Sequence, residues 1–136
     1  MLGRFYEIEG KPIKGAGRGK GLGFPTINIE MENDTLLPHG VYACRLGAAG
    51  APGQEKDFQL LDAVANLGVR PTFNAKSLLL EAYLLNYSGP EFYGKMIEVF
   101  FLKYLRPEIK FCSVAELKRQ MDADVLTAKQ FFTERQ

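Results

Sequence analysis

The sequence is poor in the residues that build structural metal centres and disulfide frameworks. Its 136 residues include one histidine, His39, and two cysteines, Cys44 and Cys112, which do not have C-x-x-C spacing. These residues are too few for a His/Cys structural zinc site, and two thiols do not form the disulfide framework of a small secreted domain. This cysteine usage is typical of a reducing compartment, so we expect a cytoplasmic protein.

Long apolar runs and an excess of one charge are also missing. No apolar run approaches the roughly 18 residues of a membrane-spanning helix, and the first residues do not have the pattern of a secretory signal. The 17 Lys and Arg residues nearly balance the 16 Asp and Glu residues, and the formal net charge is +1. Without an overall basic field, neither nucleic acid nor a membrane surface is an expected partner. The length and the hydrophobic fraction of 46% fit one globular domain.

The sequence does have a concentrated glycine-rich segment. Residues 14–23 contain five of the 14 glycines and three cations, Lys14, Arg18 and Lys20. Glycine loses much backbone entropy on ordering, so such a run is useful where backbone N–H groups close around an anion. Its spacing matches neither the P-loop nor the dinucleotide fingerprint. A plain surface loop and a phosphate-binding loop both remain open from composition.

Strand-like runs punctuated by glycine and proline fill the chain from residue 4 to about residue 111. Because strands and helices do not alternate, the pattern favours an antiparallel sheet over a parallel one. We therefore expect an antiparallel barrel of five or six strands. The runs are 4–9, 27–31, 41–46, 58–69, 78–87 and 95–105.

The periodicity becomes helical after Phe111. Ser113 and Glu116 have the spacing of a capping box, and apolar residues follow at intervals of three and four. The sequence therefore predicts a long C-terminal helix over about residues 113–134, packed against the barrel. The apolar positions are Val114, Leu117, Met121, Val125, Ala128 and Phe132.

A Pro-Thr-x-Asn segment at residues 25–28 directly follows the glycine-rich segment. In an extended chain, Thr26 and Asn28 point to the same side. A hydroxyl and an amide oxygen on one face can help to coordinate Mg²⁺ that also takes substrate phosphates. A turn after the proline is the alternative. The same motif recurs at residues 71–74, which we interpret as a structural turn.

Glu81 is the one acidic residue in the apolar run 78–85. Burial of a carboxylate costs several kcal/mol unless the group is paired, so Glu81 is either partnered by a cation or functional. A desolvated carboxylate is a better general base near neutral pH. An ion pair with a lysine or arginine remains equally open.

Residues 104–111 form a further candidate, with Arg106 before a proline and Phe111 before the helix start. Arginine and phenylalanine both stack on planar groups, so the segment could form a lip over a planar ligand. A surface arginine and a core phenylalanine are the alternative.

Together these motifs resemble the riboflavin kinases, including the C-terminal kinase module of bacterial bifunctional FAD synthetases. The resemblance runs from Leu2 to about Lys129, and its Leu-Gly-Phe-Pro-Thr-x-Asn segment is highly specific. The matching residues are Gly10, Gly15-x-Gly17-Arg18-Gly19-Lys20, Leu22-Gly23-Phe24-Pro25-Thr26-x-Asn28, Leu37-Pro38-x-Gly40-Val41-Tyr42, Ala65-Asn66-Leu67-Gly68-x-Arg70-Pro71-Thr72-Phe73, Glu81, Phe92-Tyr93-Gly94-Lys95 and Leu105-Arg106-Pro107-Glu108-x-x-Phe111-x-Ser113.

The resemblance implies a mainly β fold: a six-stranded antiparallel Greek-key β-barrel over about residues 4–111 with a long C-terminal α-helix over about 113–134. Residues 1–136 would form a single riboflavin kinase domain. The implied activity is ATP:riboflavin 5′-phosphotransfer, in which the γ-phosphoryl group of Mg-ATP moves to the riboflavin 5′-hydroxyl and gives FMN and ADP. The opening Leu2-Gly3-Arg4-x-Tyr6 resembles the junction that follows an N-terminal FMN adenylyltransferase domain. A module of a longer protein and a single-domain kinase are both consistent with it.

The resemblance also implies roles for individual residues. Glu81 would take the proton of the ribityl hydroxyl, and Thr26 and Asn28 would bind Mg²⁺. Arg106, Phe111 and Glu116 would contact the flavin. The ATP-binding residues would be Gly15, Gly17, Arg18, Lys20, Gly23, Thr26, Asn28, Leu84, Asn86 and Tyr93.

Two other classes of function remain open from the sequence. One is a flavin-binding protein without catalysis. The other is a small barrel that binds single-stranded nucleic acid through a basic loop and aromatic side chains. The net charge of only +1 and the lone Glu81 count against the nucleic-acid module.

Overall fold

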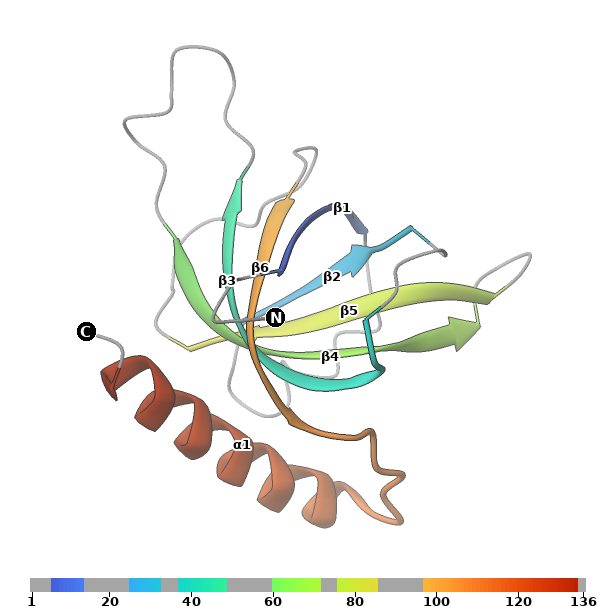
Figure 1. Ribbon diagram of the computed structural model, residues 1–136. Coiled ribbons are helices and arrows are strands. Elements are labelled where there is room, and N and C mark those ends of the chain that lie inside the picture. Colours follow the sequence, from blue (N-terminus) through green and yellow to red (C-terminus); the bar gives the residue numbers. More distant parts are fainter. Residues whose placement is uncertain are drawn as a thin grey trace.

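The computed structural model describes residues 6–13, 25–32, 37–48, 60–71, 76–85 and 97–134 (Figure 1). Strands make up most of this part of the chain, and a single helix follows them. The elements are β1 (Tyr6–Ile13), β2 (Thr26–Glu30), β3 (Gly40–Ala48), β4 (Leu61–Pro71), β5 (Lys76–Leu84), β6 (Ile97–Arg106) and α1 (Val114–Glu134).

The strands pair in the order β1-β2-β5-β4-β3-β6, and every pair is antiparallel. Strand β1 pairs with both β2 and β6, so the ring of strands closes. Strand β2 does not pair with the next strand in the chain, β3, but with β5. The expectation of a mainly β, antiparallel chain with one C-terminal helix is confirmed.

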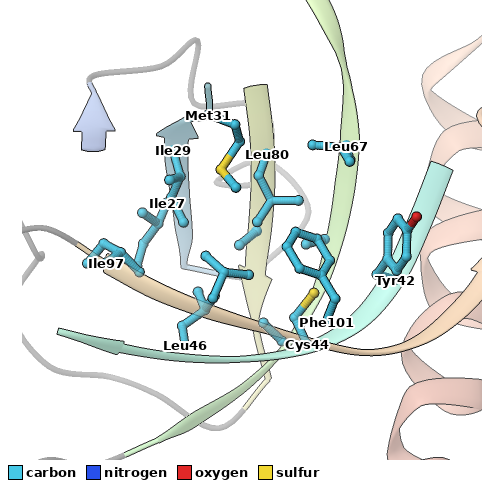
Figure 2. Close-up of a cluster of buried hydrophobic side chains, with 14 of the residues drawn as sticks. Ile27, Ile29, Met31, Tyr42, Cys44, Leu46, Leu67, Leu80, Ile97 and Phe101 are labelled. Carbon is cyan, nitrogen blue, oxygen red and sulfur yellow. The ribbon is translucent and has the colours of Figure 1, made fainter. Parts of the chain in front are cut away.

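The barrel interior holds the larger hydrophobic core, to which alternate residues of β2, β3, β4, β5 and β6 contribute (Figure 2). On β2, for example, Ile27 and Ile29 point inward, whereas Thr26 and Asn28 lie on the opposite face because side chains alternate along a strand. Cys44 is fully buried in this core, and burial raises the pKa of its thiol. The largest fully buried side chains include Ile29, Leu46, Leu67, Leu80, Leu84, Ile97 and Val99.

Helix α1 lies along the outside of the barrel (Figure 1), and a second hydrophobic cluster joins the two. Val125, Ala128 and Phe132 of α1 are buried in it. The strand side of the cluster comes from outward-facing residues of β3 and β4, namely Val41, Ala43 and Val64. Full burial of one such apolar side chain contributes about 1.5–3 kcal/mol, so this stripe fixes α1 against one part of the outer surface.

The start of α1 is set by the predicted capping box. The Ser113 hydroxyl accepts the N–H of Glu116 at 3.2 Å, and the Glu116 carboxylate accepts the N–H of Cys112 at 3.0 Å. These two bonds satisfy backbone donors that a helix start leaves open. The predicted helix and its start are confirmed. Within the described residues, no helix combines the length and the apolarity that a membrane crossing requires.

Candidate active site

The strand register brings the predicted base and one predicted metal ligand side by side. Asn28 of β2 and Glu81 of β5 are direct cross-strand partners, although they lie far apart in the sequence. On its other side, Glu81 is the partner of Asn66 of β4. All three residues alternate with core residues and therefore face outward from the barrel. Directly opposed side chains have Cβ atoms about 4.5–5.5 Å apart, so the outer surface carries the row Asn28–Glu81–Asn66.

A second row runs parallel to the first, two residues along each strand. Thr26 is the cross-strand partner of Tyr83, and Tyr83 is the partner of Val64. The Tyr83 hydroxyl donates a hydrogen bond of 2.7 Å to Oε1 of Glu81. Over the described ranges, no lysine or arginine forms an ion pair with Glu81. The alternative of a structural ion pair for Glu81 therefore has no support in this part of the chain.

Thr26 and Asn28 carry hard oxygen donors on one face, and Asn28 is 8% exposed. Neither side chain is engaged in a hydrogen bond with another described residue. In the described ranges, no group of three or more His, Cys, Asp or Glu residues could hold a metal ion by itself. A hydroxyl, an amide oxygen and a nearby carboxylate fit Mg²⁺, which keeps waters and takes substrate phosphates, better than a cation that needs a complete protein cage.

Across the sheet, the first row continues through Val41 to Arg106 on β6. The guanidinium of Arg106 binds both carboxylate oxygens of Asp124 on α1, with distances of 2.9 Å from Nε to Oδ1 and 2.7 Å from Nη2 to Oδ2. Its Nη1 also donates to the carbonyl of Pro107 at 2.9 Å. Gln120 adds a hydrogen bond to Asp124. Arg106 therefore anchors α1 to the end of β6.

The end of β6 is also shaped by Gly40 at the start of β3. Gly40 has a φ of +151°, and a Cβ at this position would lie 2.5 Å from the carbonyl oxygen of Arg106. The chain can pass so close to Arg106 only without a side chain. This contact helps to fix where β6 ends and where the following segment leaves the barrel.

A cavity of about 910 Å³ lies between the outer face of the barrel, the segment after β6 and the first turns of α1. Asn66 and Tyr83, which flank Glu81, line its wall from the strands. Arg106 and Phe111 line it from the other side, and Phe111 is half-buried. Small-molecule sites usually have volumes of about 300–1,000 Å³. The cavity therefore has the volume of a small-molecule site, and Asn66 and Tyr83 bring its wall next to Glu81.

Glu108 lies over β4 at this cavity. Its carboxylate accepts 3.0 Å and 2.9 Å hydrogen bonds from Asn66 and Arg70, respectively. A Cβ at Gly68 would lie 2.5 Å from both carboxylate oxygens, so the bare glycine makes room for Glu108. The side-chain oxygen of Asn66 is buried and has no hydrogen-bond partner among the described residues. That acceptor is available to a ligand donor.

Of the predicted site residues in the described ranges, only Arg106 and Phe111 line this cavity. Glu81, Thr26 and Asn28 do not line it, although Glu81 adjoins its wall through Asn66 and Tyr83. The side chain of Leu84 is in the barrel core, although its backbone N–H binds the carbonyl of Pro25 at 2.9 Å, at the entry to β2. Glu116 uses a carboxylate oxygen in the helix cap and does not line the cavity. The remaining predictions lie outside the described residues: Gly15, Gly17, Arg18, Lys20, Gly23, Asn86 and Tyr93.

Sequence reasoning gave no site role to Asn66, Tyr83 or Glu108. Asn66 and Tyr83 lie in predicted strand runs, and each alternates with core residues and so falls on the face of Glu81. A search for polar side chains two residues from Glu81 would have found Tyr83. Asn66 and Glu108 meet only through the strand register and the path of the segment after β6.

Comparison with known proteins places the chain in a family. The family model described as riboflavin kinase matches residues 2–132. A bifunctional riboflavin kinase/FMN adenylyltransferase of Haemophilus influenzae is 41% identical over 132 residues, which are 97% of this chain and 40% of that protein. The chain thus spans about 40% of the length of the curated relatives that it matches.

Solved structures share the fold. A crystal structure described as a macrolide-efflux protein from Streptococcus pneumoniae has a TM-score of 0.72 and 27% identity over 90% of this chain and 38% of that one. A riboflavin kinase from Trypanosoma brucei has a TM-score of 0.69 and 23% identity, and the match covers 98% of this chain and 83% of that one. With the family model matched over nearly the whole sequence, the chain belongs to the riboflavin kinase family.

Proposed function

We propose that this chain is an ATP:riboflavin 5′-phosphotransferase, which transfers the γ-phosphoryl group of ATP to the riboflavin 5′-hydroxyl and releases FMN and ADP. The observation that carries the proposal is the row Asn28–Glu81–Asn66 beside the cavity. It sets a carboxylate that has no cation partner among the described residues next to hard oxygen donors. Phosphoryl transfer requires this combination of a base and a site for charge neutralisation.

In the proposed step, the riboflavin hydroxyl oxygen forms a bond to the γ-phosphorus while the bond from that phosphorus to the bridging oxygen of ADP breaks. The carboxylate of Glu81 accepts the hydroxyl proton, and ADP leaves with the bridging oxygen. A general base at the attacking hydroxyl typically contributes about 10²–10⁴-fold to the rate.

The scaffold that we propose is the Greek-key barrel of the family, in one domain over residues 1–136.

Thr26 and Asn28 would hold Mg²⁺ together with the nucleotide phosphates. The ion, when bound, would neutralise charge that develops on the phosphates. The two residues suit this role because both side chains point outward from β2 beside Glu81, and both oxygens are free of described protein partners. Asn28 is largely buried, which reduces competition from bulk water at its amide oxygen.

For the nucleotide, we propose the glycine-rich segment with Gly15, Gly17, Arg18, Lys20 and Gly23. Its backbone N–H groups and cations would bind phosphate oxygens. We also propose Leu84, Asn86 and Tyr93 on the nucleotide side. The role of Leu84 would be exerted by its backbone, since its side chain lies in the core.

For the flavin, we propose the cavity at the start of α1. Phe111 offers an aromatic face there, and the stem of Arg106 adds to the wall. Glu116, also predicted at the flavin, would act on that side by holding Cys112 and the helix start in place.

The proposed partner of this module is an FMN adenylyltransferase domain, because the curated relatives are named for both activities. The module itself would stop at FMN. We also propose a cytoplasmic location, since both described cysteines are free thiols.

The experiment is to incubate the protein with riboflavin, ATP and Mg²⁺ and to separate the flavins by chromatography. FMN and ADP in equal amounts are the expected result. Quenching of riboflavin fluorescence without FMN would instead identify a flavin-binding protein without catalysis. Binding of a labelled oligonucleotide, with neither riboflavin binding nor FMN, would identify the nucleic-acid module.

A further inference from the structure

We propose that Tyr83 is a positioning residue for the general base: its hydroxyl fixes Oε1 of Glu81 and leaves Oε2 for the proton of the substrate hydroxyl. This inference rests on the proposed function. The hydrogen bond between Tyr83 and Glu81 can also be tested without a measurement of turnover.

The contact follows from strand geometry. Glu81 and Tyr83 are two residues apart on β5, so their side chains leave the same face of the strand. Each is flanked on both sides by cross-strand partners, which are Asn28 and Asn66 for Glu81. The hydroxyl lies 2.7 Å from Oε1, which is a short, well-formed O–H···O hydrogen bond.

The phenol ring cannot move freely. Tyr83 is 7% exposed and lines the cavity beside Val64. A carboxylate on a half-buried glutamate has rotatable bonds that would otherwise sample several orientations. A hydrogen bond from a buried, rigid donor selects one of them, and charge-assisted bonds of this kind are the stronger ones.

The two carboxylate oxygens of Glu81 have different surroundings and therefore different roles. Oε1 is occupied by Tyr83. Across the described ranges, no other side chain donates to Glu81. The second oxygen is therefore the one that can accept a proton from a hydroxyl held in the neighbouring cavity. Accurate placement of a base matters because a misplacement of about 1 Å can cost about 10²-fold in rate.

Tyr83 could instead have a purely structural role, in which its ring fills the wall of the cavity and its hydroxyl merely finds an acceptor. Both roles predict that removal of the ring is harmful. They differ for removal of the hydroxyl alone, so the variant of choice is Tyr83→Phe. Tyr42→Phe is the matched control, because Tyr42 is also buried, at 4% exposed, and its hydroxyl donates to the Pro38 carbonyl on the inner side of the barrel.

The kinetic test uses four proteins besides the wild type: Tyr83→Phe, Glu81→Gln, the double variant and Tyr42→Phe. We expect Tyr83→Phe to lower kcat by about 10- to 100-fold, the range for loss of a hydrogen bond to a charged group, with KM for riboflavin changed less than about three-fold. In the Glu81→Gln background, the same change should alter kcat less than about two-fold. Tyr42→Phe should leave kcat within about two-fold of the wild type.

Two kinetic results would overturn the inference. One is a kcat for Tyr83→Phe within about two-fold of the wild type. The other is an equal loss in the presence and absence of the Glu81 carboxylate, because Tyr83 would then act independently of Glu81.

A spectroscopic measurement separates failure of the inference from failure of the proposed function. In protein labelled with ¹³C at glutamate side chains, the carboxyl signal of Glu81 is identified by its loss in Glu81→Gln. It should shift in Tyr83→Phe and stay in place in Tyr42→Phe. An unmoved signal overturns the inference whatever the activity. If the signal shifts but the wild type makes no FMN, the hydrogen bond between Tyr83 and Glu81 is supported. The proposed function is then overturned, and with it the role of Tyr83 in catalysis.

Discussion

Two carboxylates near the outer face of the sheet, Glu81 on β5 and Asp124 on α1, have opposite surroundings. Asp124 is 5% exposed and accepts hydrogen bonds from Nε and Nη2 of Arg106 and from the side-chain amide of Gln120. Glu81 is half-buried and receives one neutral hydroxyl, from Tyr83. A buried carboxylate whose oxygens both accept hydrogen bonds from a cation has a structural role, because the pair compensates the cost of burying its charge. Glu81, with one oxygen bonded and no cation partner in the described part of the chain, keeps an oxygen that can accept a proton.

The same difference separates the elements that carry them. The junction of β6 and α1 is closed by the Arg106–Asp124 pair and by the apolar cluster around Phe132. The outer face of β2, β5 and β4 has polar side chains whose oxygens lack described partners, such as those of Thr26 and Asn66. The Arg106–Asp124 pair therefore holds α1 in place and lines one side of the cavity, whereas β4 and β5 supply the opposite wall with Asn66 and Tyr83.

The largest effect that we expect is on turnover at the open region. Glu81→Gln removes the proton acceptor and keeps the size of the side chain. It should lower kcat by about 10²–10⁴-fold while riboflavin binding and the circular dichroism spectrum stay unchanged. Near-normal turnover in this variant would remove Glu81 from the role of base and weaken the comparison with Asp124.

The next effect belongs to the closed region. Asp124→Ala leaves the guanidinium of Arg106, whose side chain is only 17% exposed, without its partner, and breaking a buried ion pair costs about 3–5 kcal/mol. Urea unfolding should report a loss of that order. The control is Asp122→Ala, whose partner Lys118 is 59% exposed and 3.8 Å away, so its removal should change the free energy of unfolding far less. Equal losses in the two variants would contradict a structural assignment for Arg106–Asp124.

A smaller effect is expected at the proposed metal ligands. Thr26→Ala removes a hydroxyl oxygen on the outer face of β2 without loss of core packing. The Mg²⁺ concentration needed for half-maximal FMN formation should rise about ten-fold, which corresponds to about 1.4 kcal/mol. Thr127→Ala on the exposed side of α1 is the matched change and should leave it unaltered. If the two variants have the same metal dependence as the wild type, the ligand assignment is wrong.

The smallest effect concerns the two thiols, one of which is exposed to solvent and one of which is closed off from it. Cys112 is exposed and Cys44 is buried, and burial raises the pKa of the Cys44 thiol. Because the thiolate is the reactive form, a thiol reagent should label Cys112 rapidly and Cys44 only on unfolding, as mass spectrometry can show. Rapid labelling of both cysteines in the folded protein would be inconsistent with the closed core.

The same pKa shift has a consequence for stability. The unfolded chain loses the Cys44 proton near the ordinary thiol pKa of about 8.5, whereas the folded chain retains it. The contribution to the free energy of unfolding is therefore complete below that pH and falls as pH rises above it. Cys44→Ala should reduce this alkaline decline in urea unfolding experiments.

Local signals in the sequence predicted the elements well. Ser113 and Glu116 marked the start of α1, and the bonds between them and Cys112 are present. Alternation at residues 27–31 indicated that Thr26 and Asn28 share a face, and they do. These features depend on neighbours in the chain, which is why sequence reasoning reaches them.

Features that depend on long-range pairing were not accessible in the same way. That Asn28 lies directly opposite Glu81 follows from pairing of β2 with β5, which the order of the strands in the sequence does not dictate. The sequence analysis does not predict the partner of Arg106, although Asp124 is three residues after Met121 and four before Ala128 and so falls on the apolar stripe of α1. Leu84 was assigned to the nucleotide, yet the alternation of β5 directs its side chain into the core. Whether its backbone contributes to the nucleotide site stays a prediction.

The most direct test of the central claim, that Glu81 beside Asn28 is the centre of phosphoryl transfer, is a single-turnover measurement. Protein in excess over riboflavin is mixed rapidly with ATP and Mg²⁺, and FMN is quantified over time, so that product release does not limit the rate. The account predicts FMN formation by the wild type and at least about 10²-fold slower formation by Glu81→Gln with riboflavin fully bound. Equal rates in the two proteins, or no FMN from the wild type, would contradict it.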